Sequence, residues 1–252
     1  MHWGAPAFGL AAYAAALVAL APATLIDGRL QSASEGRLRL AEARGSLWSG
    51  AGWIEVRDAQ GKAGVARRLA WRVLPGSLLR ARLVAQATLG QAARPFPVTL
   101  SLSRVEIADA ALQLPAAALG LGVPALAPLR LSGEVLVSIA QLSLGRGGVH
   151  GEATLQWRAA GSALTPVAPL GDYEVRFKAA GTAVHGALRT LEGPLELEGE
   201  GSWSSGAAPS YLVTARVQPR HQEQLAPLLR LIAVERGAGR FELDSASAAF
   251  GS

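Results

Sequence analysis

The residue types that most often carry catalysis or metal binding are few in this chain and far apart. Its histidines, His2, His150, His185 and His221, are widely separated, and none stands beside a carboxylate at the spacing of metal ligands. Cysteine is absent, which excludes a thiol nucleophile, a thiolate metal site and a disulfide. The chain also lacks the H-E-x-x-H, G-x-S-x-G, P-loop and G-x-G-x-x-G motifs. We therefore predict that the protein is not an enzyme, with no catalytic, cofactor-binding or metal-binding residues and no cofactor.

One acidic cluster could in principle bind a cation. Glu196, Glu198 and Glu200 alternate with apolar or small residues, so they would project from one side of a strand about 7 Å apart. Calcium sites combine such carboxylates with an Asp-rich loop, which this stretch does not have. We interpret the three glutamates as a solvated strand face that pairs with arginines of neighbouring strands, such as Arg189 or Arg216.

Basic residues gather between positions 59 and 105, where no Asp or Glu occurs. The block contains Lys62, Arg67, Arg68, Arg72, Arg80, Arg82, Arg94 and Arg104. Three interpretations stay open: an arginine-rich strand face, a surface for anionic lipid or an acidic partner protein, and a nucleic-acid site. No RNA- or DNA-binding motif accompanies the block, so we predict that nucleic acid is not a partner.

Alternating apolar and polar residues dominate the elements that must position these charges. In residues 173–178 Tyr, Val and Phe alternate with Glu, Arg and Lys, and residues 135–139, 149–157, 195–203 and 211–217 have the same period of two. One convincing helix is predicted within residues 221–234, with Pro227 in an early turn. The pattern predicts a mainly β fold, a large and mostly antiparallel sheet with one apolar face. That sheet can form a sandwich, a barrel or a curved groove for something apolar.

The same alternation gives two local expectations. Val98, Leu100 and Leu102 are out of phase by one residue with Val105 and Ile107, which predicts a β-bulge between them. The tryptophans are in phase with apolar neighbours, which predicts that they pack in the core. They are Trp48, Trp53, Trp71, Trp157 and Trp203.

The N-terminal residues 3–26 form an uncharged apolar run of 24 residues. A helix of this length would span about 36 Å, enough to cross a bilayer. We predict a retained transmembrane anchor in residues 1–26 and a β-rich domain in residues 27–252. A cleaved signal peptide and a buried core helix are the alternatives. Four arginines come after the run and none precedes it, which by the positive-inside rule would keep the domain in the cytoplasm, although long domains can override that count.

Several stretches, in order along the chain, together resemble the type II secretion system protein N family (general secretion pathway protein N). After the apolar run come residues 45–50 (GSLWSG), 69–75 (LAWRVLP) with SLL at 77–79, 112–119 (LQLPAAAL), 188–203 (LRTLEGPLELEGEGSW) and 225–232 (LAPLLRLI). Each motif alone is unspecific, and their order carries the resemblance.

The resemblance implies a single-pass inner-membrane protein with its C-terminal domain in the periplasm. It implies a non-enzymatic accessory role in the type II system, which exports folded proteins across the outer membrane, with the other secretion components and the inner membrane as partners. The family is also similar to AsmA-like proteins, whose curved sheets have an apolar inner face. This similarity gives the alternative function, a lipid-handling or envelope-maintenance protein with phospholipid as a further partner.

Overall fold

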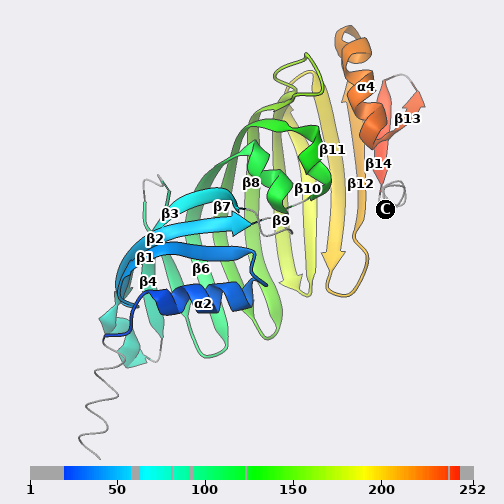
Figure 1. Cartoon of the computed structure of the whole chain (residues 1–252). Coiled ribbons are helices and arrows are strands. Elements are labelled where there is room, and N and C mark those ends of the chain that lie inside the picture. The colour runs from blue at the N-terminus through cyan, green and yellow to red at the C-terminus, as the bar shows by residue number, and fades with distance from the viewer. Residues whose placement is uncertain are drawn as a thin grey trace, which may run out of the picture. The chain divides into compact units, whose positions relative to one another are not determined.

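The computed structural model describes residues 20–57, 63–80, 82–90, 94–122, 124–237 and 239–244. The chain divides into two compact units, unit 1 (Met1–Pro95) and unit 2 (Phe96–Ser252), which we describe one at a time. Both units are built mainly from antiparallel strands (Figure 1). The predicted mainly β, antiparallel class is therefore confirmed.

In the described part of unit 1, helix α2 accompanies four strands that pair in the order β1-β2-β3-β4. Its elements are α2 (Thr24–Ala33), β1 (Leu38–Gly45), β2 (Ser49–Arg57), β3 (Ala63–Leu74), the 3-10 helix η1 (Pro75–Arg80) and β4 (Leu83–Leu89). The turn predicted at residues 45–50 joins β1 to β2, and the short helical turn predicted after Pro75 is η1.

A small core holds α2 against the strands of unit 1. Ala23, Leu40 and Trp71 are buried at its centre, and Ile26 and Leu30 of the helix pack against them. A polar contact adds to this packing, because the Asp27 carboxylate accepts a hydrogen bond of 2.8 Å from the Leu40 backbone N–H. The residues from Ala23 onward thus belong to the packing of unit 1.

The described residues of unit 2 form ten antiparallel strands in the order β5 to β12, then β14, then β13. Its strands are β5 (Phe96–Leu100), β6 (Arg104–Pro115), β7 (Leu131–Gly145), β8 (Gly148–Ser162), β9 (Gly171–Gly181), β10 (Ala183–Glu192), β11 (Leu195–Ser204), β12 (Ser210–Val217), β13 (Val234–Gly237) and β14 (Arg240–Asp244). Its helical segments are η2 (Ala116–Ala118), α3 (Leu119–Gly122), η3 (Pro124–Leu129), η4 (Pro219–His221) and α4 (Gln222–Ile232). The last strand in this order, β13, is an edge of the sheet as the structure describes it.

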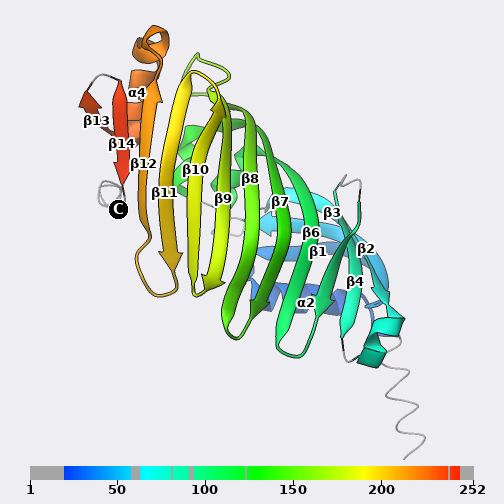
Figure 2. The ribbon, with the colours of Figure 1, turned by 180° about the vertical axis from the view of Figure 1, so that it is seen from behind.

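The helical segments of unit 2 lie on one face of its sheet. In Figure 1 α4 and the short helices after β6 stand in front of the strands, and in Figure 2, from behind, the strands β6 to β12 are seen uncovered. Side chains alternate along a strand, so only one of the two faces has to be apolar. The single layer of helices matches that requirement.

The core of unit 2 lies beneath α4. Leu225 and Leu229, one helical turn apart, are 0 % and 2 % exposed, and Phe241 of β14 is 0 % exposed. They pack with buried side chains of β11, β12 and η3, namely Leu195, Ala215, Val217 and Leu129. The predicted amphipathic helix is confirmed, and its apolar side covers one end of the apolar sheet face.

The predicted β-bulge and the predicted position of Pro227 are both wrong. The phase change after Leu102 is a hairpin, because β5 ends at Leu100, β6 begins at Arg104, and Ser101 N–H donates to Arg104 O at 2.9 Å. A turn resets the alternation in the same way as a bulge does. Pro227 is the sixth residue of α4, so it lies inside the helix and not in an early turn.

Most of the predicted anchor, residues 1–19, lies outside the described residues. Its last part is described, and α2 begins there at Thr24. None of the helices in the described part of the chain is long and apolar enough to cross a membrane.

Candidate interaction surfaces

The histidines lie on separate elements of unit 2. His150 is in β8, His185 in β10 and His221 in η4, while His2 is outside the described residues. Over the described ranges, no cluster of three or more His, Asp or Glu side chains could hold a metal ion.

The three glutamates of β11 stand opposite the neighbouring strands as the alternation predicts. Glu196 is paired with Arg216 of β12, and Glu198 is paired with Arg189 of β10. The predicted cross-strand neighbours are confirmed. Arg189, however, forms its ion pair with a carboxylate of β9, the neighbouring strand on the other side of β10.

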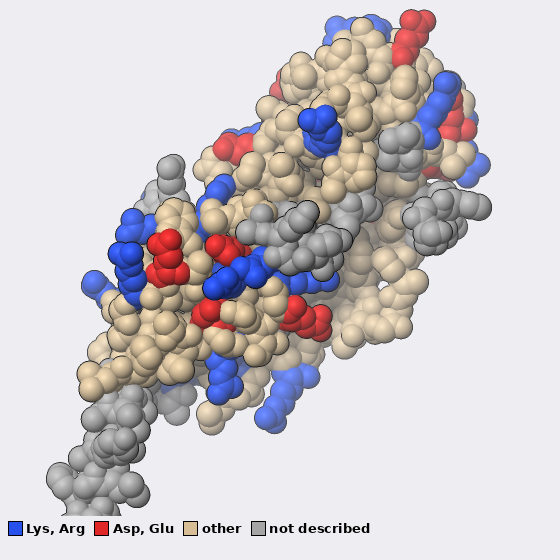
Figure 3. All heavy atoms as spheres, in the orientation of Figure 1, with Lys and Arg blue, Asp and Glu red and all other residues tan. Residues whose placement is uncertain are grey.

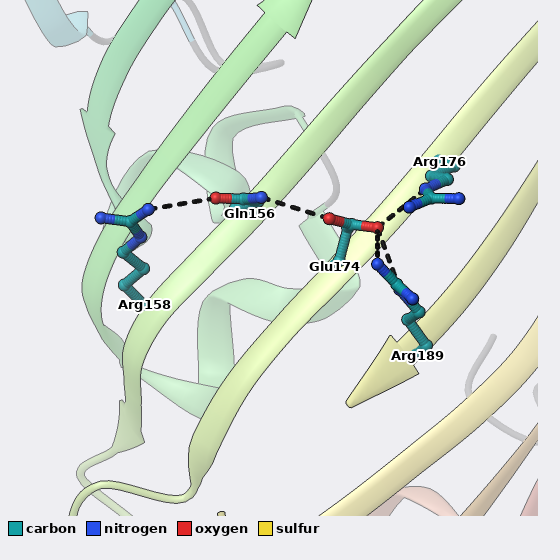
Figure 4. A network of polar contacts seen from close by, with 5 residues as sticks. All are labelled: Gln156, Arg158, Glu174, Arg176 and Arg189. Carbon is teal, nitrogen blue, oxygen red and sulfur yellow. Dashed lines mark hydrogen bonds and ion pairs between the residues drawn. The ribbon is translucent and has the colours of Figure 1, made fainter. Parts of the chain in front are cut away.

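That carboxylate is Glu174 of β9, the centre of a polar network (Figure 4). Arg189 Nη2 and Arg176 Nε each lie 2.8 Å from Glu174 Oε1. Gln156 of β8 donates to Glu174 Oε2 at 3.2 Å and accepts from Arg158 at 3.3 Å. The Glu174 side chain is only 7 % exposed, whereas both arginines remain more than half exposed.

The strand register explains this network. Gln156, Glu174 and Arg189 are direct partners across β8, β9 and β10, and Arg176 comes two residues after Glu174 on the same side of β9. Removal from water acts to raise the pKa of Glu174. The hydrogen bonds from Gln156 and Arg189 and the charges of both arginines outweigh that effect and lower the pKa of Glu174 below its ordinary value. Glu174 is therefore held as a carboxylate that joins three strands on the polar face.

A shallow depression of about 360 Å³ adjoins this network on the same face. Its charged lining side chains come from β10, β11 and β12, and include Arg189, Glu196, Glu198 and Arg216. Charges of both signs surround the hollow. Such a lining does not select a strongly anionic or cationic ligand.

The opposite side of the sheet is the apolar face. Its side chains form rows across the strands, because directly paired residues of neighbouring strands lie on the same face. One row consists of Leu112, Val137, Leu155, Val175 and Leu188; the next contains Ala110, Ile139, Ala153 and Phe177; a third ends in Ala179, Val184 and Trp203.

Much of this apolar face is half-exposed within unit 2. Val137, Leu155, Val175 and Phe177 are all partly accessible, in contrast to the buried residues under α4. The side chain of Trp203 is 39 % exposed, although its ring lies 6.3 Å from that of Phe177. A face of this kind can bind apolar surface.

The expectation that the tryptophans form core is confirmed for Trp71, which is 8 % exposed. It is wrong for Trp53 and Trp203, which are 43 % and 39 % exposed, while Trp48 and Trp157 are partly buried. Alternation places a side chain on a face of the sheet. Whether that face is covered depends on other elements.

The basic block lies mostly in unit 1. Residues 1–95 hold twelve Lys and Arg against five Asp and Glu, whereas residues 96–252 hold twelve against fourteen. Arg67, Arg68 and Arg72 are in β3, and Arg82 precedes β4. Figure 3 shows the blue side chains of Lys and Arg scattered over the tan surface, with red acidic groups among them. Lys62 lies outside the described residues.

These features define a class of protein: a mainly β chain whose antiparallel strands separate an apolar face from a charged face, with short helices on the apolar side. Comparison with family profiles gives the family. The profile described as type II secretion system (T2SS), protein N, matches residues 36–244, and the chain belongs to this family. It is a family of secretion-system components and not a known enzyme family. Comparisons with curated proteins and with solved structures found no match.

The match confirms the resemblance carried by the ordered motifs. The structure adds two features that the sequence did not predict. The polar network around Glu174 depends on register across three strands, and helix α2 depends on the apolar contacts of Leu40 and Trp71. The alternation of 173–178 was the available signal for the first, because it places Glu174 and Arg176 on one side of a strand.

Proposed function

We propose that this protein is a non-enzymatic accessory component of the type II secretion system, anchored in the inner membrane with its β-rich domain in the periplasm. The observation that carries the proposal is the family match over residues 36–244. Family membership implies interaction with other secretion-system components, and the export of folded proteins across the outer membrane is the process it serves.

The anchor in this proposal is the uncharged run of residues 3–26. Arg29, Arg37 and Arg39 come soon after this run, and positive charges at that position oppose translocation of the domain that comes after them. Long domains cross the membrane largely regardless of that count. The count of arginines therefore does not exclude the periplasm, and the periplasm is the location that family membership favours.

A topology and processing assay tests the location. A reporter that is active only in the periplasm is fused after Ser252, and the mature N-terminus of the same protein is determined. The proposal expects an active reporter on an uncleaved, membrane-bound chain. An inactive reporter would place the domain in the cytoplasm and refute the proposed topology.

A deletion strain tests the role in secretion. Loss of the gene is expected to reduce export of the system's substrates or the assembly of its other components, and a tagged chain is expected to co-purify with those components. Normal export together with an absence of co-purifying secretion components would refute the role.

The half-exposed apolar face of unit 2 favours a second candidate function, the handling of lipid. Half-exposed side chains such as Leu155, Val175 and Phe177 resemble the apolar lining that a lipid chain needs. Native mass spectrometry of the gently purified chain would then show bound phospholipid. The Trp203→Gln variant should lose it, and the matched control Leu212→Gln, on the polar face, should keep it. A lipid-free wild-type chain would refute this candidate.

A further inference from the structure

The N-terminal residues of the described chain are fixed directly onto one end of unit 1. Ala23 N–H donates to Gly45 O at 3.2 Å, Leu47 N–H donates to Ala21 O at 2.8 Å, and Pro22 forms a bridge with Ser46. Ala21 and Ala23 are 9 % and 1 % exposed. The end of the apolar run is therefore part of the body of unit 1. We call this end of the unit, with the β1–β2 turn and η1, the proximal end.

Large apolar side chains are exposed at the proximal end. Leu20 and Leu25 are 79 % and 55 % exposed, and Leu74, the last residue of β3, is 41 % exposed. Val73 N–H donates to Trp48 O at 2.7 Å, which places the end of β3 beside the β1–β2 turn. In Figure 1 the first turn of α2 and the 3-10 helix after β3 lie at the same end of these strands. Three exposed leucines together indicate a surface that meets apolar material.

Arginines accompany these leucines. Arg44 and Arg72 lie on the same side of the sheet at this end, next to the β1–β2 turn, and Arg82 immediately precedes β4. All three are exposed, and none forms an ion pair with a carboxylate that the structure describes. The acidic residue Glu42 of β1 lies two residues before Arg44 in the sequence and is also exposed. Unit 1 therefore presents an excess of positive charge where its apolar side chains are exposed.

We propose that the proximal end of unit 1 docks directly on the membrane surface. Leu20, Leu25 and Leu74 enter the headgroup region, and Arg44, Arg72 and Arg82 bind anionic lipid headgroups. The inference rests on the anchored topology given under Proposed function. It adds a second contact between the protein and the bilayer, which fixes the height and orientation of unit 1.

Chain continuity favours lipid over an acidic protein as the occupant. Residues 21–23 are fixed to unit 1, and the uncharged run of the proposed anchor leads into them without a spacer. An anchor that crosses the bilayer therefore brings the proximal end to the headgroups. Arginine and a half-buried tryptophan, Trp48, are residue types found at this depth.

The absence of cysteine from the chain makes a site-specific test possible. The full chain carrying Leu74→Cys is labelled with an environment-sensitive fluorophore and reconstituted into vesicles of phosphatidylcholine, with or without phosphatidylglycerol. A lipid with a nitroxide near its headgroup serves as quencher. The matched control is Ser32→Cys, exposed in the last turn of α2, at the other end of that helix within unit 1.

Docking predicts strong quenching at position 74, weak quenching at position 32, and stronger quenching at position 74 when phosphatidylglycerol is present. Replacing Arg44, Arg72 or Arg82 by Gln should lower the ratio of docked to undocked protein by about fivefold for each arginine. A control triple variant with Arg130, Arg146 and Arg220 of unit 2 replaced by Gln removes the same charge and should leave quenching at position 74 unchanged.

Vesicle flotation separates this proposal from the topology on which it rests. A chain that floats with vesicles but shows equal quenching at positions 74 and 32 retains its anchor and overturns the docking. Quenching that does not depend on phosphatidylglycerol or on the three arginines overturns the binding of anionic headgroups by these arginines. A chain that does not float with either vesicle overturns both the anchor and the docking.

Discussion

The packing of α4 on the sheet of unit 2 can be tested by a single substitution, Leu225→Ala. The Leu225 side chain is 0 % exposed and is surrounded by Leu229, Phe241 and the buried residues of β11 and β12. The change removes three buried carbons. At about 0.8 kcal/mol for each, complete collapse of the space would cost about 2.4 kcal/mol, and a cavity that persists raises the cost toward about 5 kcal/mol. We expect a loss of about 3–4 kcal/mol, because neighbours on both the helix and the sheet restrict collapse.

Hydrogen–deuterium exchange is the assay of choice, because it reports the opening free energy of unit 2 separately from that of unit 1. Amides of α4, β12 and β14 should lose protection equivalent to about 3–4 kcal/mol. The control is Leu212→Ala, the same change at a β12 side chain that is 55 % exposed, with an expected effect below about 1 kcal/mol. Equal effects of the two substitutions, or a loss below about 1 kcal/mol at Leu225, would refute the assignment of the core.

Three further predictions concern polar groups. Glu174→Gln should destabilise unit 2 by about 1–2 kcal/mol at neutral pH, because it removes charge-assisted hydrogen bonds to two half-exposed arginines. The pKa of Glu174 is lowered by folding, so its contribution is complete above the ordinary value of 4.5 and is lost as the pH falls further. Denaturation curves at a series of pH values should therefore show a weaker acid dependence in the variant, and an unchanged dependence would contradict the network. Tyr173→Phe should cost about 1–2 kcal/mol, because the buried hydroxyl lies 3.1 Å from Leu170 O and 2.9 Å from Leu195 O and can donate to either. Burial also raises the pKa of Tyr173, and an absorbance titration should show a tyrosine ionisation at high pH that the Tyr173→Phe variant lacks. Asp27→Ala should free the Leu40 amide, which is measured as faster exchange at that position, and unchanged protection would show that the carboxylate does not hold α2 on β1.

The strands of unit 2 show how much of the structure can be predicted from the local sequence pattern. Residues 173–178 alternate strictly, and this is enough to place Val175 and Phe177 on one face and Glu174 and Arg176 on the other. The break after Leu102 was harder to interpret, since a bulge and a hairpin both shift the phase by one residue. Only the pairing of Leu100 with Val105 distinguishes them.

Helix α2 shows why some elements cannot be predicted from sequence. Its first residues continue the apolar run, and the helix itself is only weakly amphipathic. The contacts that hold it in place are long-range: Ile26 and Leu30 pack near Trp71, and Asp27 bonds to Leu40. These partners are distant in sequence, so no local pattern indicates them.

The sequence by itself determined the class of fold, the faces of the strands, the helix at 222–232 and the family, because alternation, helical spacing and ordered motifs are local properties of the chain. Tertiary structure alone decided which faces are covered and which charges meet. Trp71 is buried because α2 packs near it, and Trp203 is exposed because α4 covers another part of the sheet. Arg189 binds Glu174, although Glu198 is also its cross-strand neighbour, because a strand inside a sheet offers each side chain a partner on both sides. The choice between those partners depends on packing and register across several strands.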